Sequence, residues 1–497
     1  MKIAVIGLDG VGFPILDRVF EHEAMPYLKD LIEKSARGIL KSTVPPYTPT
    51  AWTSIASGVN PGKHGVLDFV TFVDGYKTRI INALDVKYPR IHEMIAIQHM
   101  KSICVNLVPT YPITFKLENC MVISDWLAPK ISYYPKLLER YVKNYPIHVP
   151  ISSYKSNAEA VEGLYAEARV KAKVACSIME HEDWNLFWFV YNEPDHILHR
   201  CYEEVWSGEG KVLRIFEVFD QTIRKATEIA DLTVIVSDHG FSDYRYVINI
   251  NSFLNELGLI KETWKKTIKD LIDFEIDDTT KRVALPRSIY KIASVRPIKT
   301  VAKKIFRFIT KKDLKAQLPF VDLENSKAFM GSSTSSGVYV KDTRLIDSII
   351  KELKGLKGVK NAWRREEIYC GPFLNKMPEI FFIPDFDNGY FYGTSMLHPK
   401  IITTKINYQN HHPDGIIVLS GRGVNPSDLG TVKTFDVIPT ILRYMGLPLP
   451  VDTDGTPIPG INYPSNNLRR YDYLRHWQLI RRIQAKRAAI TNRLRRK

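Results

Sequence analysis

The stretch Leu232-Thr233-Val234-Ile235-Val236-Ser237-Asp238-His239-Gly240 decides how this chain folds. Its first five residues are apolar or β-branched and show no polar alternation, which is typical of a strand buried on both faces of a parallel sheet. In open α/β sheets, functional side chains gather at the carboxyl ends of the strands, where Asp238 and His239 fall. Carboxylate and imidazole are ligands that suit a zinc-like divalent ion. The alternative is an ordinary turn capped by Asp238, so the metal site depends on further ligands at other strand ends.

A second strand end has the same form. Residues Ile3–Leu8 are predicted to be a buried strand that stops at Asp9-Gly10, and an amphipathic helix follows from about Phe13. A parallel sheet would bring Asp9 to the same edge as Asp238. The alternative for Asp9 alone is that it caps the helix that follows.

A third predicted strand, residues 184–191, leads into Asn192-Glu193-Pro194-Asp195-His196-Ile197-Leu198-His199. Pro194 favours a helix that begins at this point. Asp195 and His199 then lie four residues apart on one helix face, close enough to share an ion. His196 points about 100° away from Asp195 and is a weaker ligand candidate. A carboxylate–imidazole pair on the surface is the alternative.

The composition is that of a globular protein. The chain has 497 residues, 45% of them hydrophobic, which is enough for two or three domains. Its five cysteines are scattered without a CxxC pair, which fits neither a disulfide framework nor a thiolate metal site. The chain begins with a strand pattern rather than a signal peptide, and no segment approaches the roughly 18 to 20 apolar residues that span a bilayer. We therefore expect a cytoplasmic protein.

The net charge of +15 is unevenly distributed. The tail, residues 468–497, holds eleven Lys/Arg against one acid, and residues 281–315 hold twelve Lys/Arg against one acid. The rest of the chain is therefore net acidic. Leu474, Trp477, Ile480 and Leu494 give the tail an amphipathic helical pattern, which favours an anionic membrane surface or nucleic acid as its partner. A tail that only aids solubility is the default alternative.

Three prolines precede a predicted helix over residues 51–57, in the stretch Val44-Pro45-Pro46-Tyr47-Thr48-Pro49-Thr50. A hydroxyl at a helix start lies beside backbone N–H donors and the positive end of the helix dipole. These conditions favour attack on an anionic phosphorus centre, provided that a group such as a metal lowers the pKa of the hydroxyl. The alternative is that Thr48 or Thr50 caps the helix.

The segment Thr48-Pro-Thr-Ala-Trp-Thr-Ser-Ile-Ala-Ser-Gly-Val-Asn-Pro-Gly-Lys-His-Gly resembles the nucleophile segment of the alkaline phosphatase superfamily. It is most similar to the type I phosphodiesterase/nucleotide pyrophosphatase branch, whose nucleophilic threonine lies ten residues before the glycine at Gly58. The resemblance implies that Thr48 is the nucleophile, with Thr50 as runner-up. Better-known members have an asparagine where this chain has Ala51. His64 is predicted to have a structural role.

A second element, His411-His412-Pro413-Asp414-Gly415, resembles the family's His-x-x-Asp-Gly motif, with His411 as the ligand and His412 as its rival. The resemblance implies two divalent ions, with zinc as the first choice and manganese or iron as alternatives. Two sets of ligands would hold them: Asp195, His199 and His411 for one ion, and Asp9, Asp238 and His239 for the other, with Thr48 bound to the second ion as an alkoxide.

The resemblance also implies a three-layer alkaline-phosphatase-like α/β fold with a central, mostly parallel sheet. We expect catalytic parts at residues 1–260 and 318–465, a helical charged insertion at 261–317 that can act as a lid, and a basic C-terminal helix at 466–497. Residues 101–107 are another predicted strand, and a loop follows its carboxyl end. Asn106 near the end of this strand and Tyr111 in the loop are candidate substrate contacts, with turn and packing roles as the alternative.

The expected function is cleavage of phosphodiester or pyrophosphate bonds in a small phosphate ester, a nucleotide or related compound, through a phosphothreonine intermediate. A phosphomonoesterase, phosphonate hydrolase or phosphotransferase of the same superfamily is the alternative. A sulfatase is disfavoured because no Cys/Ser-x-Pro-x-Arg segment is present. A second alternative is a non-catalytic binder of anionic surfaces. The pattern leaves the oligomeric state open.

Overall fold

The structure is a computed structural model that describes residues 1–73, 77–263, 320–331, 337–393, 397–398, 400–464 and 469–494. Apart from its first three residues, the predicted insertion at 261–317 lies outside this described part. The short strands β11 (Glu262–Thr263) and β12 (Phe320–Val321) pair antiparallel. Thr263 and Phe320, which border residues 264–319, are therefore direct neighbours in this pair of strands.

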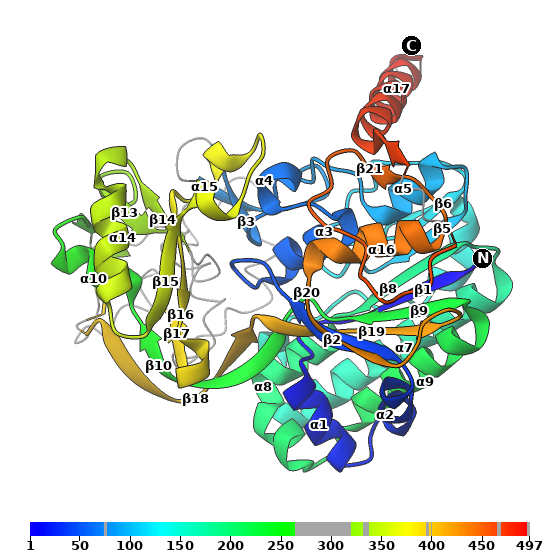
Figure 1. Cartoon of the computed structure of the whole chain (residues 1–497), viewed down its shortest axis with the longest axis horizontal. Coiled ribbons are helices and arrows are strands. Elements are labelled where there is room, and N and C mark those ends of the chain that lie inside the picture. The colour runs from blue at the N-terminus through cyan, green and yellow to red at the C-terminus, as the bar shows by residue number, and fades with distance from the viewer. Residues whose placement is uncertain are drawn as a thin grey trace, which may run out of the picture.

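A nine-stranded sheet forms the centre of the larger lobe (Figure 1). Its strands are β1 (Ile3–Leu8), β2 (Ala36–Lys41), β5 (Ser102–Val105), β6 (Cys120–Ile123), β7 (Tyr133–Tyr134), β8 (Leu186–Tyr191), β9 (Leu232–Val236), β19 (Asp414–Gly421) and β20 (Ser427–Lys433). The order is β20-β2-β19-β9-β1-β8-β5-β6-β7. The run from β9 to β6 is parallel, whereas β19 is antiparallel to both its neighbours and β7 is antiparallel to β6. The predicted α/β fold with a mostly parallel sheet is confirmed.

Helices cover both faces of this sheet. One face carries α1 (Phe13–Glu21), α2 (Pro26–Glu33), α7 (Asn157–His181), α8 (Glu193–Ser207) and α9 (Arg214–Ile229). The other carries α3 (Thr48–Ser57), α5 (Ile91–Ile97) and α16 (Val437–Tyr444). Within β1, Ile6 and Leu8 face the first layer and Ile3 and Val5 face the second. A strand buried on both sides needs apolar residues at every position, which explains the lack of polar alternation.

A second, smaller lobe lies at one end of the sheet (Figure 1). It contains the antiparallel sheet β13 (Ala328–Met330), β14 (Gly337–Val340), β16 (Ile380–Pro384) and β15 (Val359–Arg364), with α10 (Ile250–Glu256) and α14 (Ile346–Gly355). The long antiparallel strands β10 (Gly240–Ile248) and β18 (Ile402–His412) connect the two lobes, and β17 (Tyr390–Tyr392) pairs with β10. Because β10 starts directly after His239 and β18 ends at His412, this connection begins beside the predicted metal ligands.

Short elements complete the described part. They are the strands β3 (Val70–Val73), β4 (Lys77–Ile80), β21 (Leu449–Pro450) and β22 (Arg470–Tyr471), the helices α4 (Pro61–His64), α6 (Glu139–Val142) and α15 (Arg365–Ile368), and 3-10 turns at Lys136–Leu138, Ile151–Ser153, Thr343–Leu345, Leu374–Lys376, Phe386–Asn388 and Thr434–Asp436. Within the described residues, no helix has the length and apolar character needed to cross a bilayer. All five cysteines lie in this described part and are free thiols.

Two local predictions need correction. The helix predicted at 51–57 begins earlier, at Thr48, and its cap residue is Tyr47, which makes no side-chain capping bond. Neither Thr48 nor Thr50 therefore caps α3, because both already lie inside its first turn. Pro49 at the second helical position allows this early start, since its missing N–H is not needed there.

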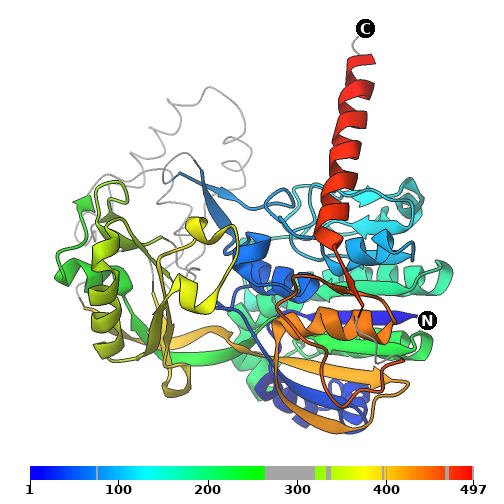
Figure 2. The same cartoon turned by 45° about the horizontal axis from the view of Figure 1, so that its top comes forward.

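The basic C-terminal helix α17 (Tyr473–Leu494) extends away from the body of the molecule (Figure 2). Leu474, Trp477 and Ile480, which gave the tail its amphipathic pattern, face the body of the protein instead of a partner. Trp477 is buried, and Leu474 and Ile480 pack against the same core as α5. The side chain of Leu494 lies outside the described residues.

Candidate active site

Parallel strand ends bring the predicted ligands together. The ends of β8, β1 and β9 are adjacent, with Leu8 opposite Tyr191 and Gly7 opposite Val236. Asp9 and Asp238 follow β1 and β9, while Asp195 lies in the first turn of α8, directly after β8. Side chains that are far apart in the sequence thus meet at the carboxyl edge of one sheet.

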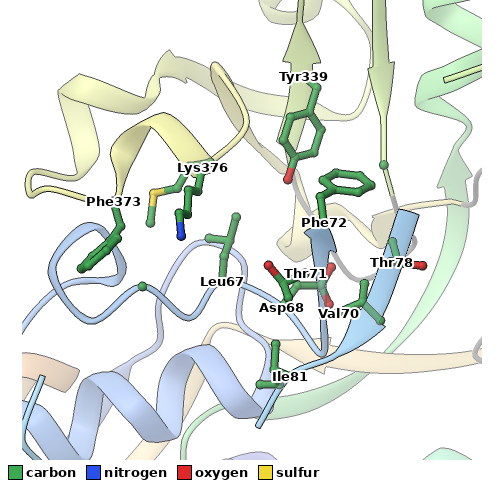
Figure 3. Close-up of a pocket in the computed structure, with 13 residues that line it drawn as sticks. Leu67, Asp68, Val70, Thr71, Phe72, Thr78, Ile81, Tyr339, Phe373 and Lys376 are labelled. Carbon is green, nitrogen blue, oxygen red and sulfur yellow. The ribbon is translucent and has the colours of Figure 1, made fainter. Parts of the chain in front are cut away.

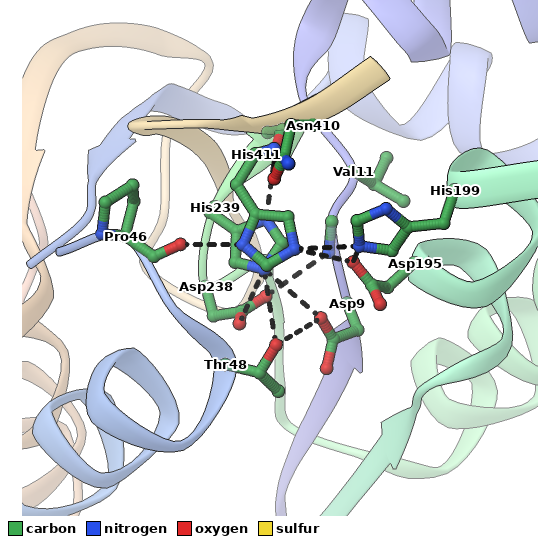
Figure 4. A network of polar contacts seen from close by, with 12 residues as sticks. Asp9, Val11, Pro46, Thr48, Asp195, His199, Asp238, His239, Asn410 and His411 are labelled. Atoms are coloured by element: carbon green, nitrogen blue, oxygen red, sulfur yellow. Dashed lines mark hydrogen bonds and ion pairs between the residues drawn. The ribbon is translucent and has the colours of Figure 1, made fainter. Parts of the chain in front are cut away.

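The first group consists of Asp195, His199 and His411 (Figure 4). The Nε2 atoms of the two histidines are 3.1 Å apart. Asp195 Oδ1 lies 3.1 Å from Nε2 of His411 and 3.5 Å from Nε2 of His199. One oxygen and two ring nitrogens therefore converge on one point, which is the ligand set that a zinc-like ion takes.

The second group consists of Asp9, Asp238 and His239, all buried. His239 Nε2 is 3.5 Å from Asp9 Oδ1 and 3.3 Å from Asp238 Oδ2. The Thr48 hydroxyl joins this group, with Oγ1 3.5 Å from Asp9 Oδ1 and 3.4 Å from His239 Nε2. The rings of His239 and His411 stack with their centroids 3.7 Å apart, so the two groups are in direct contact.

Backbone carbonyls set the protonation of both stacked histidines. His239 Nδ1 lies 3.0 Å from the carbonyl of Gly240, and His411 Nδ1 lies 2.9 Å from the carbonyl of Pro46. A carbonyl can only accept a hydrogen bond, so each Nδ1 carries a proton, and Nε2 is the ring atom with which the neutral imidazole can bind a metal. This arrangement orients an imidazole as a metal ligand.

The charges at the site favour a bound cation. Burial raises the pKa of Asp9, and the neighbouring carboxylates of Asp238 and Asp195 raise it further. Burial and Asp195 likewise raise the pKa of Asp238, whose buried Oδ2 has no hydrogen-bond partner among the residues that the structure describes. For Asp195, the imidazoles of His199 and His411 outweigh burial and lower the pKa. Among the described residues, no Lys or Arg forms an ion pair with these three carboxylates. The donor set therefore fits divalent ions, which would neutralise it.

Two supporting residues were not singled out from the sequence. The indole N–H of Trp52 donates a 2.9 Å hydrogen bond to Asp9 Oδ2, which leaves Oδ1 facing Thr48. Trp52 lies four residues after Thr48, so the helical spacing placed both on one face of α3. Gly10 has a positive φ of 76°, and a Cβ at this position would lie 3.2 Å from the Cα of Asp195. Only glycine allows the strand end to approach Asp195 so closely.

The alternative candidates for the nucleophile and the metal ligands make contacts outside the two groups. Thr50 donates its hydroxyl to the carbonyl of Leu67, and His412 Nδ1 accepts from the backbone N–H of Asp414. His196 packs at 4.4 Å from the ring of His148 and outside both groups. His64 is buried against Ser54, with 2.9 Å between Nε2 and Oγ, in agreement with a structural role.

The predicted substrate contacts lie outside the two groups. Asn106 is buried and donates from Nδ2 to the Val190 carbonyl (2.8 Å) and to Asn192 Oδ1 (2.9 Å). These bonds hold the turn between β8 and α8. The backbone N–H of Tyr111 donates to Asp125 Oδ2 over 2.9 Å.

A separate pocket lies between the β3–β4 hairpin and the smaller lobe (Figure 3). Phe72, Tyr339 and Phe373 contribute aromatic walls, and Lys376 contributes an amine. None of the residues that line it belongs to the two ligand groups. Leu67, whose carbonyl accepts the Thr50 hydroxyl, connects the pocket to α3.

Comparison with known proteins agrees with this geometry. The sequence model of the family described as type I phosphodiesterase / nucleotide pyrophosphatase matches residues 3–352. No curated protein gives a significant match. Among solved structures, phosphonoacetate hydrolase from Sinorhizobium meliloti 1021 is similar, with a TM-score of 0.55 and 13% identity over 88% of this chain and 94% of that chain. Wild-type alkaline phosphatase PafA has a TM-score of 0.51 and 12% identity over 93% and 98% of the two chains.

At such low identity the two solved structures support the fold alone. The family match is different, because it covers most of the chain and includes Asp9, Thr48, Asp195 and the Asp238-His239 pair. The resemblance of the Thr48 segment to this family is thereby confirmed. The chain belongs to the type I phosphodiesterase / nucleotide pyrophosphatase family, a family of hydrolytic enzymes.

Proposed function

We propose that this protein is a two-metal phosphohydrolase that cleaves phosphodiester or pyrophosphate bonds of a nucleotide or related small ester, with Thr48 as nucleophile. The observation that carries the proposal is the position of the Thr48 hydroxyl beside the buried group of candidate metal ligands. Its Oγ1 lies 3.5 Å from Asp9 Oδ1 and 3.4 Å from His239 Nε2. Membership in a family of hydrolytic enzymes leaves a purely non-catalytic binder without support.

The proposed ligands divide as the geometry groups them. Asp195, His199 and His411 would hold one ion, and Asp9, Asp238 and His239 the other, beside Thr48. When bound, divalent ions supply charge neutralisation for the phosphoryl oxygens and lower the pKa of a coordinated hydroxyl. Zinc is the first choice for Asp and His ligands, and manganese or iron are the alternatives.

The residues of the chain define the reaction sequence. Thr48 Oγ1 gives its proton to solvent and forms a bond to phosphorus, while the bond from phosphorus to the leaving oxygen breaks and that oxygen departs with the electron pair and takes up a proton from solvent. The oxygen of a water molecule then bonds to phosphorus, the bond between Oγ1 and phosphorus breaks, and a proton from that water restores the Thr48 hydroxyl and frees the phosphate product. Thr48 begins α3, so the positive end of the helix dipole lies beside the developing negative charge.

The test compares Thr48→Ala with Thr50→Ala on bis-p-nitrophenyl phosphate. Thr48→Ala is expected to abolish turnover while the metal content of the purified protein persists, and Thr50→Ala to retain activity because its hydroxyl bonds Leu67. Unchanged activity in Thr48→Ala would place the nucleophile elsewhere. Faster turnover of the monoester p-nitrophenyl phosphate, or of phosphonoacetate, would favour the phosphomonoesterase or phosphonate hydrolase alternative.

A further inference from the structure

We infer that the outward face of α17 docks this protein on an anionic lipid bilayer. This face is formed by Leu479, Ile483 and Ile490 and is not the apolar face that the sequence pattern suggested. The inference concerns a surface remote from Thr48 and does not depend on the proposed function.

The helix has two apolar faces. On the inner face, Tyr473 and Trp477 are buried, and Gln484 donates to the carbonyl of Lys116 at 2.6 Å. At about 100° per residue, Leu479, Ile483 and Ile490 fall within about 40° of one another and roughly 120° from that inner face. Packing against the body therefore directs a second aliphatic stripe toward solvent.

This stripe is unusual for its exposure. Leu479, Ile483 and Ile490 are 54%, 43% and 59% exposed. They account for three of the ten exposed large apolar side chains in the described residues, within a single stretch of twelve residues. The stripe extends about 16 Å along a helix that projects from the larger lobe (Figure 2).

Cations line one edge of the stripe. By the same helical spacing, Arg475, Arg482 and Lys486 lie together along one side of the three aliphatic residues, and all three are exposed. Within the described part of the chain, none of these three forms an ion pair. A helix with an aliphatic stripe and a row of basic side chains beside it matches a bilayer interface, where lipid phosphates meet the cations and acyl chains meet the stripe.

The same features disfavour other occupants. Two copies of α17 paired through this stripe would bring like charges together. Nucleic acid would engage the basic side chains, but the aliphatic stripe would gain little, since bases bind by stacking on aromatic or guanidinium groups. An anionic bilayer is the partner that uses both parts of the face.

The test measures co-sedimentation of the full chain with phosphatidylcholine vesicles, with and without phosphatidylserine. We expect binding to the anionic vesicles. Leu479→Ser/Ile483→Ser/Ile490→Ser should lower the vesicle affinity by at least about tenfold. Arg475→Gln/Arg482→Gln/Lys486→Gln should lower the affinity most at low salt, and its difference from wild type should shrink as added salt screens the wild-type attraction. The matched control Leu84→Ser/Ile147→Ser/Val451→Ser removes three similarly exposed apolar side chains elsewhere and should bind as wild type. Thermal unfolding checks that each variant is folded.

Equal binding of the stripe variant and wild type would overturn the inference, as would the absence of binding to anionic vesicles. Binding of single-stranded RNA that is lost only in the charge variant, without vesicle binding, would indicate nucleic acid instead. A dimer in solution that the stripe variant dissolves, without vesicle binding, would indicate a second copy of the chain. Turnover of a soluble diester should be unchanged in the stripe variant, which separates this result from failure of the proposed function.

Discussion

Replacing Trp52 by phenylalanine should weaken metal binding without disturbing the fold. The indole N–H donates at 2.9 Å to Asp9 Oδ2, and both side chains are buried. A hydrogen bond to a charged acceptor is worth about 1.5 to 3 kcal/mol. Since about 1.4 kcal/mol is a factor of ten, affinity should fall by about 10- to 100-fold, which is also the range for residues that support metal ligands.

The pH dependence gives the same prediction a second readout. Burial and neighbouring carboxylates raise the pKa of Asp9, and the Trp52 hydrogen bond opposes this rise. Removal of the bond should therefore raise the pKa of Asp9 further. Because the carboxylate must be deprotonated to bind a metal, the metal-binding curve of Trp52→Phe should shift to higher pH.

Trp188→Phe is the matched control. Trp188 is equally buried in the same core, but its indole N–H has no hydrogen-bond partner. Both variants lose the same side-chain volume, whereas only Trp52→Phe loses a hydrogen bond to Asp9, a proposed metal ligand. Affinity for zinc or manganese, measured by competition with a chelating dye, should fall in Trp52→Phe alone. An equal loss in both variants, or none in Trp52→Phe, would refute the role of the hydrogen bond.

Three further predictions concern stability. Lys171 Nζ lies 2.7 Å from Glu193 Oε1, and both side chains are buried. Lys171→Met leaves the carboxylate unpaired and should lower the free energy of unfolding by about 3 to 5 kcal/mol, measured by chemical denaturation. Lys171→Met/Glu193→Gln should recover much of this loss. Burial lowers the pKa of His64 from 6.5 to about 3. Between these pH values the imidazole is protonated in the unfolded chain but not in the folded protein, so stability falls as the pH drops from 6.5 toward 3. His64→Gln should therefore lose less stability than wild type over this pH range, as measured by thermal unfolding at each pH. Chelation should lower the unfolding temperature. Asp238→Asn should stabilise the metal-free protein, because it removes a carboxylate that burial and the charge of Asp195 disfavour; a metal-free Asp238→Asn protein less stable than wild type would contradict the charge argument.

The sequence alone determined the elements and the edge at which polar side chains collect. Strands such as Leu232–Val236 are buried on both faces and so carry no polar alternation, and the acid that follows each strand marks its carboxyl end. Parallel packing then requires Asp9, Asp195 and Asp238 to lie near one another. The spacing of the Thr48 segment identified the family, because a motif is a local property of the chain.

Only the tertiary structure decided which side of each element faces which partner. His411 and His412 are adjacent on β18 and point to opposite faces, and pairing with β10 determines that His411 faces His239. Periodicity likewise showed that α17 is amphipathic, but contact with the body determined which of its two apolar faces is buried. Side-chain spacing establishes relative directions within one element, whereas the absolute direction depends on contacts between residues that are distant in the sequence.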